Sequence, residues 1–456
     1  MTRDSDRLAT RLREATHGLT APPELLAAVR TGGRRRLRRR RTTAAGVVAV
    51  VAAVVLGVPS LWPSVPHRLL QVAGWSDGSA ATVRPLPQGA LPERIAGYSY
   101  LTGSVWASPP GPVLALYQQG FGVELMDFPQ ALVMSADGED YHRVDLAERR
   151  AGPESQGDPA PMLLSPDGTQ VAVGRHSSRA ADVALLDLTT GDVVRHAVPG
   201  ARSVQPVAWS ADGRWLAYLA NEEPTNPHSG RAASGEPGLM DLRTGTPRTL
   251  PGPGTAIAMA FAPDSSQLAV QRSGGGVQVV GTDGSPVRDL GTSGWLAGPS
   301  AWSPDGRQLL VGSTEGGLEL LDATGGGAVV NAVAPEAGVV LEVLGWTAPR
   351  RLLLAATAED DGEGDFQVVE VDLDTQQRRL ITTVPTSGNF AVSRFQLATA
   401  LLPGLQAHPG GEVDRGPWPV WLQVCLVLAV LLVLTSVVRL RQQHLQRQHP
   451  TVANPP

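Results

Sequence analysis

A four-residue phrase recurs along the middle of the chain, and this repeat constrains the fold more than any other feature of the sequence. Its copies are Ser165–Gly168, Ser210–Gly213, Ala262–Ser265 and Ser303–Gly306, and each stands between two short apolar runs. Their aspartates lie 45, 52 and 41 residues apart. A period in the forties, with a strand on each side of a turn, is typical of propeller blades.

A second repeated phrase predicts a later turn in each blade. It starts with an aspartate and reads Asp-Leu-Thr-Thr-Gly or a variant of it, and copies begin at Asp187, Asp241, Asp322 and Asp372. Each copy follows its blade's first turn by fewer than 30 residues, so we expect it to join the third and fourth strands. The phrase Ser135–Gly138 resembles the first motif but stands in this later position, as does Gly281–Gly284.

The chemistry of the first motif is that of a tight turn. Proline fixes φ, aspartate accepts hydrogen bonds from nearby backbone amides, and glycine adopts the positive φ that ends the turn. The aspartates therefore repeat because the turn repeats. We interpret them as structural residues and do not expect them to form a catalytic cluster.

The spacing predicts six blades, with a degenerate seventh as the alternative. Blade one is expected to open near Trp106 and to end near Leu146, and blade six opens at Trp346, 44 residues after Trp302. The strand at residues 395–402 is expected to close the ring by pairing near residues 98–101. The predicted fold is therefore an all-β propeller.

These motifs resemble those of the TolB-like and WD-repeat-like β-propellers over roughly residues 97–402. The resemblance implies four-stranded blades, a central channel, and protein or ligand binding on the faces of the ring. It implies no shared catalytic residues. Blades one and six depart from the motif, which leaves the number of blades open between six and seven.

Two apolar runs, at residues 43–62 and 418–438, have the length of about 20 residues that spans a bilayer. Arginines precede the first run at residues 34–41 and follow the second from Arg439, and basic flanks stay on the cytoplasmic side. Residues 1–42 carry a net charge of +8, residues 439–456 carry +3, and residues 43–438 carry −16. This asymmetry predicts two single transmembrane helices, both termini in the cytoplasm and the propeller outside. The alternative for the first run is a cleaved signal peptide.

The expected organisation has seven parts. They are a cytoplasmic Arg-rich tail at 1–42, a transmembrane helix at 43–62, a linker at 63–96, the propeller at 97–402, a linker at 403–417, a second transmembrane helix at 418–438 and a cytoplasmic tail at 439–456.

The sequence offers little for catalysis. Cys425 is the only cysteine, so a disulfide framework and a cysteine zinc site are excluded, and the nine histidines do not fall at metal-ligand spacing. Gly74–Gly78 fits the nucleophile-elbow pattern but stands in the linker, without the strand and helix that the pattern requires. We predict no catalytic residue, no metal, no cofactor and no nucleic-acid partner, and hence not an enzyme.

The loops indicate where binding is expected. In a blade, the first and third turns share one face of the ring, and the other face carries the second-to-third loops and the connections between blades. That face receives the long segments 147–161, 221–237 and 359–365. Loops on a rigid scaffold commonly carry binding residues. The candidate binding residues are Asn221, Glu222, Glu223, His228, Arg231, Glu359, Asp360, Asp361 and Asp365.

The functional prediction is a membrane-anchored extracytoplasmic propeller that acts as a non-catalytic scaffold or sensor for a protein or envelope ligand. The alternative is a transmembrane regulator whose cytoplasmic segment, residues 1–33, signals to an intracellular partner. Both interpretations place the chain in the cell membrane as a multi-pass protein with a protein partner outside the cytoplasm. The ligand and the oligomeric state are left open.

Overall fold

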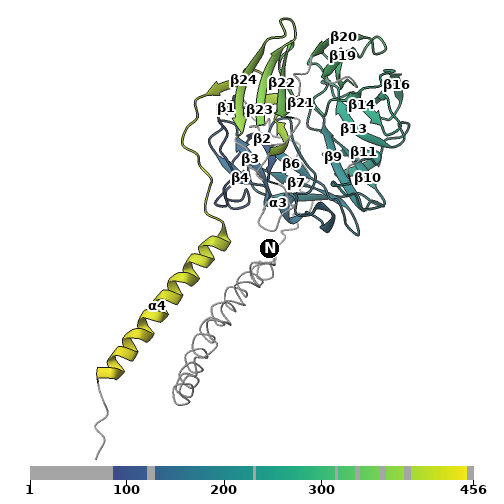
Figure 1. The fold of residues 1–456 in the computed structure, drawn as a ribbon. Helices are drawn as coiled ribbons and strands as arrows, with labels where there is room; N and C mark the ends of the chain where they lie inside the picture. The colour runs from purple at the N-terminus through teal and green to yellow at the C-terminus, as the bar shows by residue number, and fades with distance from the viewer. Residues whose placement is uncertain are drawn as a thin grey trace, which may run out of the picture. The chain divides into compact units, whose positions relative to one another are not determined.

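Six four-stranded antiparallel sheets form the blades of a propeller in the part of the chain that the computed structural model describes (Figure 1). The structure describes residues 86–120, 129–229, 233–313, 317–333, 339–358, 366–384 and 392–448. The predicted propeller is thus confirmed, with six blades within these ranges. Residues 74–420 form one compact unit, which holds the propeller, and residues 421–456 belong to a second unit.

Blades 2 to 6 each use four strands that are consecutive in the chain, ordered from the inner strand to the outer one. Blade 2 is β5 (Met162–Leu164), β6 (Gln170–Val173), β7 (Asp182–Asp187) and β8 (Val193–Ala197). Blade 3 is β9 (Ser203–Trp209), β10 (Trp215–Asn221), β11 (Glu236–Asp241) and β12 (Thr246–Thr249). Blade 4 is β13 (Ala256–Phe261), β14 (Gln267–Arg272), β15 (Val277–Gly281) and β16 (Pro286–Asp289). Blade 5 is β17 (Trp295–Leu296), β18 (Gln308–Gly312), β19 (Leu318–Asp322) and β20 (Val329–Val333). Blade 6 is β21 (Val339–Ala348), β22 (Arg351–Ala358), β23 (Phe366–Asp372) and β24 (Arg378–Val384).

Blade 1 closes the ring because its strands come from both ends of the domain. Its inner strand is β25 (Val392–Leu397), and its outer three are β2 (Val113–Gln119), β3 (Gln130–Ser135) and β4 (Tyr141–Arg143). A closing strand was predicted at residues 395–402, but the strand lies at Val392–Leu397, because Thr399–Leu401 form the 3-10 helix η3. Its predicted partner, near residues 98–101, was also wrong. β25 pairs with β2, in a register that sets Ala115 opposite Leu397. β2 is buried at all seven positions, and its first five residues, Val113–Tyr117, form the apolar run of a strand inside a blade before Gln118 and Gln119 end it.

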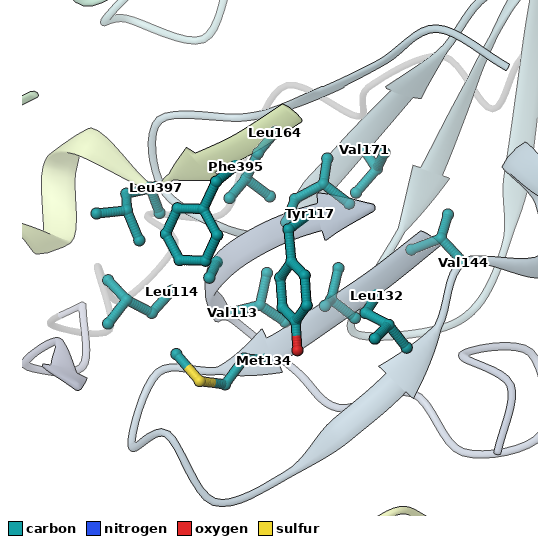
Figure 2. Close-up of a cluster of buried hydrophobic side chains, with 14 of the residues drawn as sticks. Val113, Leu114, Tyr117, Leu132, Met134, Val144, Leu164, Val171, Phe395 and Leu397 are labelled. Carbon is teal, nitrogen blue, oxygen red and sulfur yellow. The ribbon is translucent and has the colours of Figure 1, made fainter. Parts of the chain in front are cut away.

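Aromatic packing holds this junction together (Figure 2). Phe395 of β25 lies 5.5 Å from the ring of Tyr117 on β2 and 5.1 Å from that of Phe366 in blade 6, measured between ring centroids. Gln396 adds polar contacts to blade 2, because its side-chain oxygen accepts the Leu164 amide at 2.9 Å and its Nε2 donates to the Met162 carbonyl at 3.0 Å. The closing strand therefore contacts blades 1, 2 and 6.

The repeated phrase forms the turn between the first and second strands in blades 2 to 5, as predicted. In blade 5, Ser303 Oγ donates to Asp305 at 2.6 Å, Asp305 accepts the Arg307 amide at 3.0 Å, and Gly306 has φ 69°. The Asp-containing phrases join the third and fourth strands, and Ser135–Gly138 does so in blade 1. Blade 1 has no copy at its first turn because its first two strands are not consecutive in the chain. We call this side of the ring the turn face and the opposite side the loop face.

Buried tryptophans explain the 44-residue spacing between Trp302 and Trp346. Trp302 Nε1 donates to the Ala260 carbonyl of blade 4 at 3.1 Å, and Trp346 Nε1 donates to the Ser300 carbonyl of blade 5 at 3.2 Å. Each indole therefore joins its own blade to the preceding blade. The 44-residue spacing between these two tryptophans is the spacing of the blades.

Two segments outside the blades cover the edges of blades 6 and 1. β1 (Ala90–Pro92) pairs in parallel with β26 (Gln406–His408). Residues 93–95 then run beside β24, where the Ile95 amide donates to the Thr383 carbonyl at 2.9 Å. Residues 96–106, which we call the N-terminal strap, and residues 412–417, the C-terminal strap, pair with β4. Covered edges cannot recruit strands from other chains.

After the C-terminal strap the chain enters α4 (Val420–Gln448), a 29-residue helix. Within the described residues it is the one helix long and apolar enough to cross a membrane, over Leu422–Leu440. The second predicted span, residues 418–438, overlaps this apolar segment. The first predicted span, residues 43–62, and the Gly74–Gly78 phrase lie outside the described residues.

Candidate binding face

Three long segments of the loop face meet beside the inner strand of blade 1. The first connects blade 1 to blade 2 and holds α3 (Asp145–Arg149) and the short 3-10 helix η1 (Pro153–Ser155). The second is the loop after β6, which begins at Gly174. The third is the loop after β10, of which residues 222–229 are described. Hydrogen bonds between these segments build one continuous surface.

Asp158 is the centre of this surface, and only 4% of the residue is exposed. Its Oδ1 accepts the side-chain amide of Gln118 at 2.9 Å, and its Oδ2 lies 3.4 Å from Nε2 of His228. The same nitrogen of His228 lies 2.9 Å from the carbonyl oxygen of Ser155. A buried carboxylate is stable only where such partners compensate for lost water. Asp158 therefore holds the loop of blade 3 against the connection between blades 1 and 2.

Arg394 of β25 adds a positive charge to the same cluster. Its Nη1 donates to the Pro159 carbonyl at 3.2 Å. Burial lowers the pKa of its guanidinium, and the nearby Asp158 carboxylate opposes that shift. The residue has φ 53°, a left-handed conformation that costs free energy for a side chain with a Cβ. We call Gln118, Asp158, His228 and Arg394 the loop-face cluster.

A second charged group fixes the start of the connection. Arg150, 4% exposed, donates to both carboxylate oxygens of Asp182, at 2.9 and 3.1 Å, and Arg175 donates to the same carboxylate at 2.8 Å. Burial raises the pKa of Asp182, but the hydrogen bonds from the two arginines outweigh it and hold that pKa below its ordinary value. Burial lowers the pKa of Arg150. This ion network makes the surface rigid.

The loop of blade 3 is fastened at two further points. The Thr225 amide donates to the His176 carbonyl at 2.9 Å, and the Thr225 hydroxyl lies 3.2 Å from Nδ1 of His176. Ser203 Oγ donates to the Glu223 carbonyl at 3.0 Å. The backbone of this loop is therefore positioned, while its outward side chains stay available.

The predicted binding residues separate into two sets. Asn221, Glu222, Glu223 and His228 lie on the loop face, and the side chains of Glu222 and Glu223 are exposed. Glu223 pairs with Arg202 at 3.3 Å across the surface. His228 has an inward-facing contact with Asp158 that the sequence could not indicate. The remaining candidates lie outside the described residues, and they are Arg231, Glu359, Asp360, Asp361 and Asp365.

Sequence reasoning missed Asp158, Arg394, Gln118 and His176. Asp158 lies within the segment 147–161, which the sequence had indicated as a long connection on the loop face, and that position was the one sequence feature that could have identified it. No sequence feature could have identified Arg394, because its position beside Asp158 depends on ring closure. Within the ranges that the structure describes, no three side chains of His, Cys, Asp or Glu form a group that could hold a metal ion.

A cavity of about 70 Å³ lies among the inner strands and is lined by residues of blades 1, 2, 3, 5 and 6. Its walls combine apolar side chains such as Leu164, Trp209 and Phe395 with polar ones such as Ser300 and Gln396. Glu342 of β21 contributes a carboxyl group, and burial raises its pKa. A volume of this size holds a few water molecules or one small group of a ligand.

Comparisons with known proteins assign no role to any residue of this chain. No protein-family model matches the chain, and no curated protein matches it in sequence. A crystal structure of TolB from Acinetobacter baumannii is 17% identical with a TM-score of 0.43, and the match covers 63% of this chain and 67% of that one. A putative TolB from Agrobacterium tumefaciens is 13% identical with a TM-score of 0.39, covering 63% and 99%. The propeller domain of Cps50 (Swd1) from Myceliophteria thermophila is 19% identical with a TM-score of 0.34, covering 50% and 71%. Over the described residues the chain is a six-bladed β-propeller, and the solved structures to which it is similar include TolB and the Cps50 (Swd1) propeller.

Proposed function

We propose that this chain is a non-catalytic binding protein, anchored in the membrane, which engages a protein or envelope ligand outside the cytoplasm through its loop face. One observation carries the proposal: the buried carboxylate of Asp158 joins two long loop-face segments into one rigid surface. The motif turns of the opposite face are short and bonded within themselves. A preorganised surface loses little conformational entropy on binding.

The contacts of the loop-face cluster favour binding over catalysis. His228 and Arg394 use their side chains to hold neighbouring backbone at Ser155 and Pro159. Side chains that are hydrogen-bonded to backbone carbonyls in this way position the loops. The exposed carboxylates of Glu222 and Glu223 lie at the rim of this surface, which suits a partner with a basic or hydrogen-bond-donating patch.

The experiment is photo-crosslinking in cells from a residue on each face of the same blade. A photoreactive amino acid replaces Glu222 on the loop face or Arg243 on the turn face, both of which are exposed. We expect a discrete adduct from position 222 and none from position 243. The adduct should weaken when Asp158→Ala releases the loop. Equal adducts from both faces, or an adduct unaffected by Asp158→Ala, would contradict the proposal.

Membrane topology is the second part of the proposal. It is supported by the apolar segment Leu422–Leu440 and by the charge asymmetry between the terminal regions and residues 43–438. We propose two spans, one at residues 43–62 and one within α4, with both termini in the cytoplasm. Protease added to intact cells should then cut within residues 97–402 and leave epitope tags at both termini protected. Cleavage of either tag in intact cells would rule out this topology.

A further inference from the structure

Large apolar side chains are exposed on the two straps beside blade 1. Tyr100 is 45% exposed, Leu101 41%, Trp106 55% and Trp418 53%. We call these four residues the strap patch. Exposed aromatic residues that cluster commonly mark an interaction surface, whereas scattered ones need no explanation.

The straps are fastened to each other, so the patch is a fixed feature. The Gly103 amide donates to the Arg415 carbonyl at 2.7 Å, and a Cβ at Gly103 would lie 2.6 Å from the Pro417 oxygen. The Arg415 side chain donates to Thr102 Oγ1 at 3.1 Å and to the Gly97 carbonyl at 2.8 Å. These contacts hold the segment that bears Tyr100, Leu101 and Trp106 beside the residue that precedes Trp418.

Trp106 is positioned by the outer edge of blade 1. The Val105 amide donates to the Arg143 carbonyl at 2.9 Å, and the Trp106 amide donates to Ser104 Oγ at 3.1 Å. Ser104 Oγ in turn donates to Asp145 at 2.6 Å. The backbone on both sides of Trp106 is thus bonded, although its indole is exposed.

The chain itself indicates what covers this patch. Trp418 stands two residues before Val420, where α4 begins, and an extended chain spans at most about 3.6 Å per residue. The strap patch is therefore tethered within a few residues of the apolar segment Leu422–Leu440. The sequence is also uncharged from residue 95 to residue 123 and from residue 416 to residue 438. The two segments that bear the patch therefore add no charge whose burial would cost free energy, and the charged side chains next to them, Asp145 and Arg415, are hydrogen-bonded to the N-terminal strap.

We propose that the strap patch lies in the headgroup region of the bilayer that α4 enters, so that the outer edge of blade 1 rests on the membrane. The inference rests on the proposed membrane anchor. Tryptophan and tyrosine are enriched at this depth because their rings are apolar and their N–H and O–H groups can hydrogen-bond. With the anchor helix, the patch gives the propeller a second attachment, which restricts how it rotates about α4.

The experiment uses the full chain in phosphatidylcholine vesicles with spin labels on single cysteines. Because Cys425 is the only cysteine, Cys425→Ser provides a background in which Trp106→Cys or Leu101→Cys is the sole labelling site. The matched control is Trp295→Cys, since Trp295 on blade 5 is 52% exposed, close to the 55% of Trp106. Collision with aqueous nickel chelate and with lipid-soluble oxygen then reports the environment of each label.

We expect labels at 101 and 106 to collide several-fold less with the nickel chelate, and more with oxygen, than the label at 295. Equal access to nickel chelate at 106 and 295 would overturn the proposal. Low access to both reagents would also overturn it, since that indicates a protein partner on the patch. A label on native Cys425 tests the anchor separately: lipid exposure there with aqueous exposure at 106 refutes the patch alone, and aqueous exposure at Cys425 refutes the anchor and the patch together.

Discussion

The smallest unit that repeats in this molecule is one aspartate with a hydroxyl group two residues before it. In blade 5, Ser303 Oγ donates to Asp305 and accepts the Gln308 amide at 2.9 Å. In blade 3, Ser210 makes the equivalent contacts with Asp212 at 2.6 Å and with the Trp215 amide at 2.8 Å. Each of these turns satisfies its own backbone amides, so those amides are not free to bind a ligand.

Removing one such carboxylate should weaken a single turn. We expect Asp305→Asn to lower the free energy of unfolding by about 1 kcal/mol, because the charged acceptor for the Ser303 hydroxyl and the Arg307 amide is lost at an exposed site. Urea titration measures this change. The control is Asp192→Asn, since Asp192 is exposed in the connection between β7 and β8 and its carboxylate makes no hydrogen bond or ion pair within the described residues. Equal decreases in the free energy of unfolding for both variants would show that the hydrogen bonds accepted by Asp305 do not stabilise the turn.

The sequence predicts these residues well because every partner of Asp305 lies within three positions of it. It could not predict the loop-face cluster. Asp158 and Arg394 are separated by more than 200 residues, and they meet only because β25 enters blade 1. His228 was identified from its loop, but its contact with Asp158 depends on how two separate loops pack.

At the scale of elements, β25 determines whether the ring is closed. We expect Phe395→Ala to lower the free energy of unfolding by about 3–5 kcal/mol, since Phe395 is 1% exposed and its ring contacts Tyr117 and Phe366. The loss should be accompanied by faster amide hydrogen exchange in β2 and β25. Phe261→Ala, in the core of blade 4, is the matched control. If Phe261→Ala accelerates amide exchange in β2 as strongly as Phe395→Ala does, the pairing of β25 with β2 is not a locally unstable part of the ring.

The straps are a second element whose contribution can be measured. We expect Arg415→Gln to cost about 1–3 kcal/mol, because the guanidinium bonds to Thr102 and Gly97 are lost. Limited proteolysis should then cut near residues 96–106 earlier than in the parent chain. Arg351→Gln, which removes an exposed arginine at the start of β22 in blade 6, should leave the digestion pattern unchanged. An unchanged pattern for Arg415→Gln would mean that β4 alone holds the strap.

Elements with a local signature were predictable, and those defined by distant pairing were not. The turn phrases locate β5 to β20 because each turn lies between strands that are neighbours in the chain. β2 and β25 are instead separated by five blades, so no turn records their pairing. The parallel pair β1 and β26 was missed for the same reason, and residues 86–96 and 403–417 were interpreted as linkers although their backbone bonds to the propeller.

For the whole molecule, the turn carboxylates predict acid sensitivity. Hydrogen bonds from Ser303 lower the pKa of Asp305, and those from Thr324 lower the pKa of Asp322. Backbone bonds do the same for Asp372. A carboxyl whose pKa is lower in the folded state contributes stability that is present above its unfolded value and is lost as pH falls through the folded value. Burial raises the pKa of Glu342, which acts in the opposite direction.

We therefore expect the free energy of unfolding to change little between pH 7 and about pH 5, and to fall steeply below about pH 4. Urea midpoints measured across this range provide the test. The combined variant Asp305→Asn and Asp322→Asn should show a shallower fall, because fewer lowered pKa values remain. A stability that keeps rising down to pH 3 would show that carboxyls such as Glu342 outweigh the turns.

The way the ring closes also sets the order in which the protein can be made. The innermost strand of the first blade is the last strand of the propeller to be synthesised. Until residue 397 has emerged, blade 1 has three strands and Tyr117 lacks the ring that covers it. The apolar segment Leu422–Leu440 follows only about 25 residues later. Completion of the ring and synthesis of α4 thus fall within the same short interval of translation, so a chain that terminates before residue 392 would have an open propeller and would lack α4.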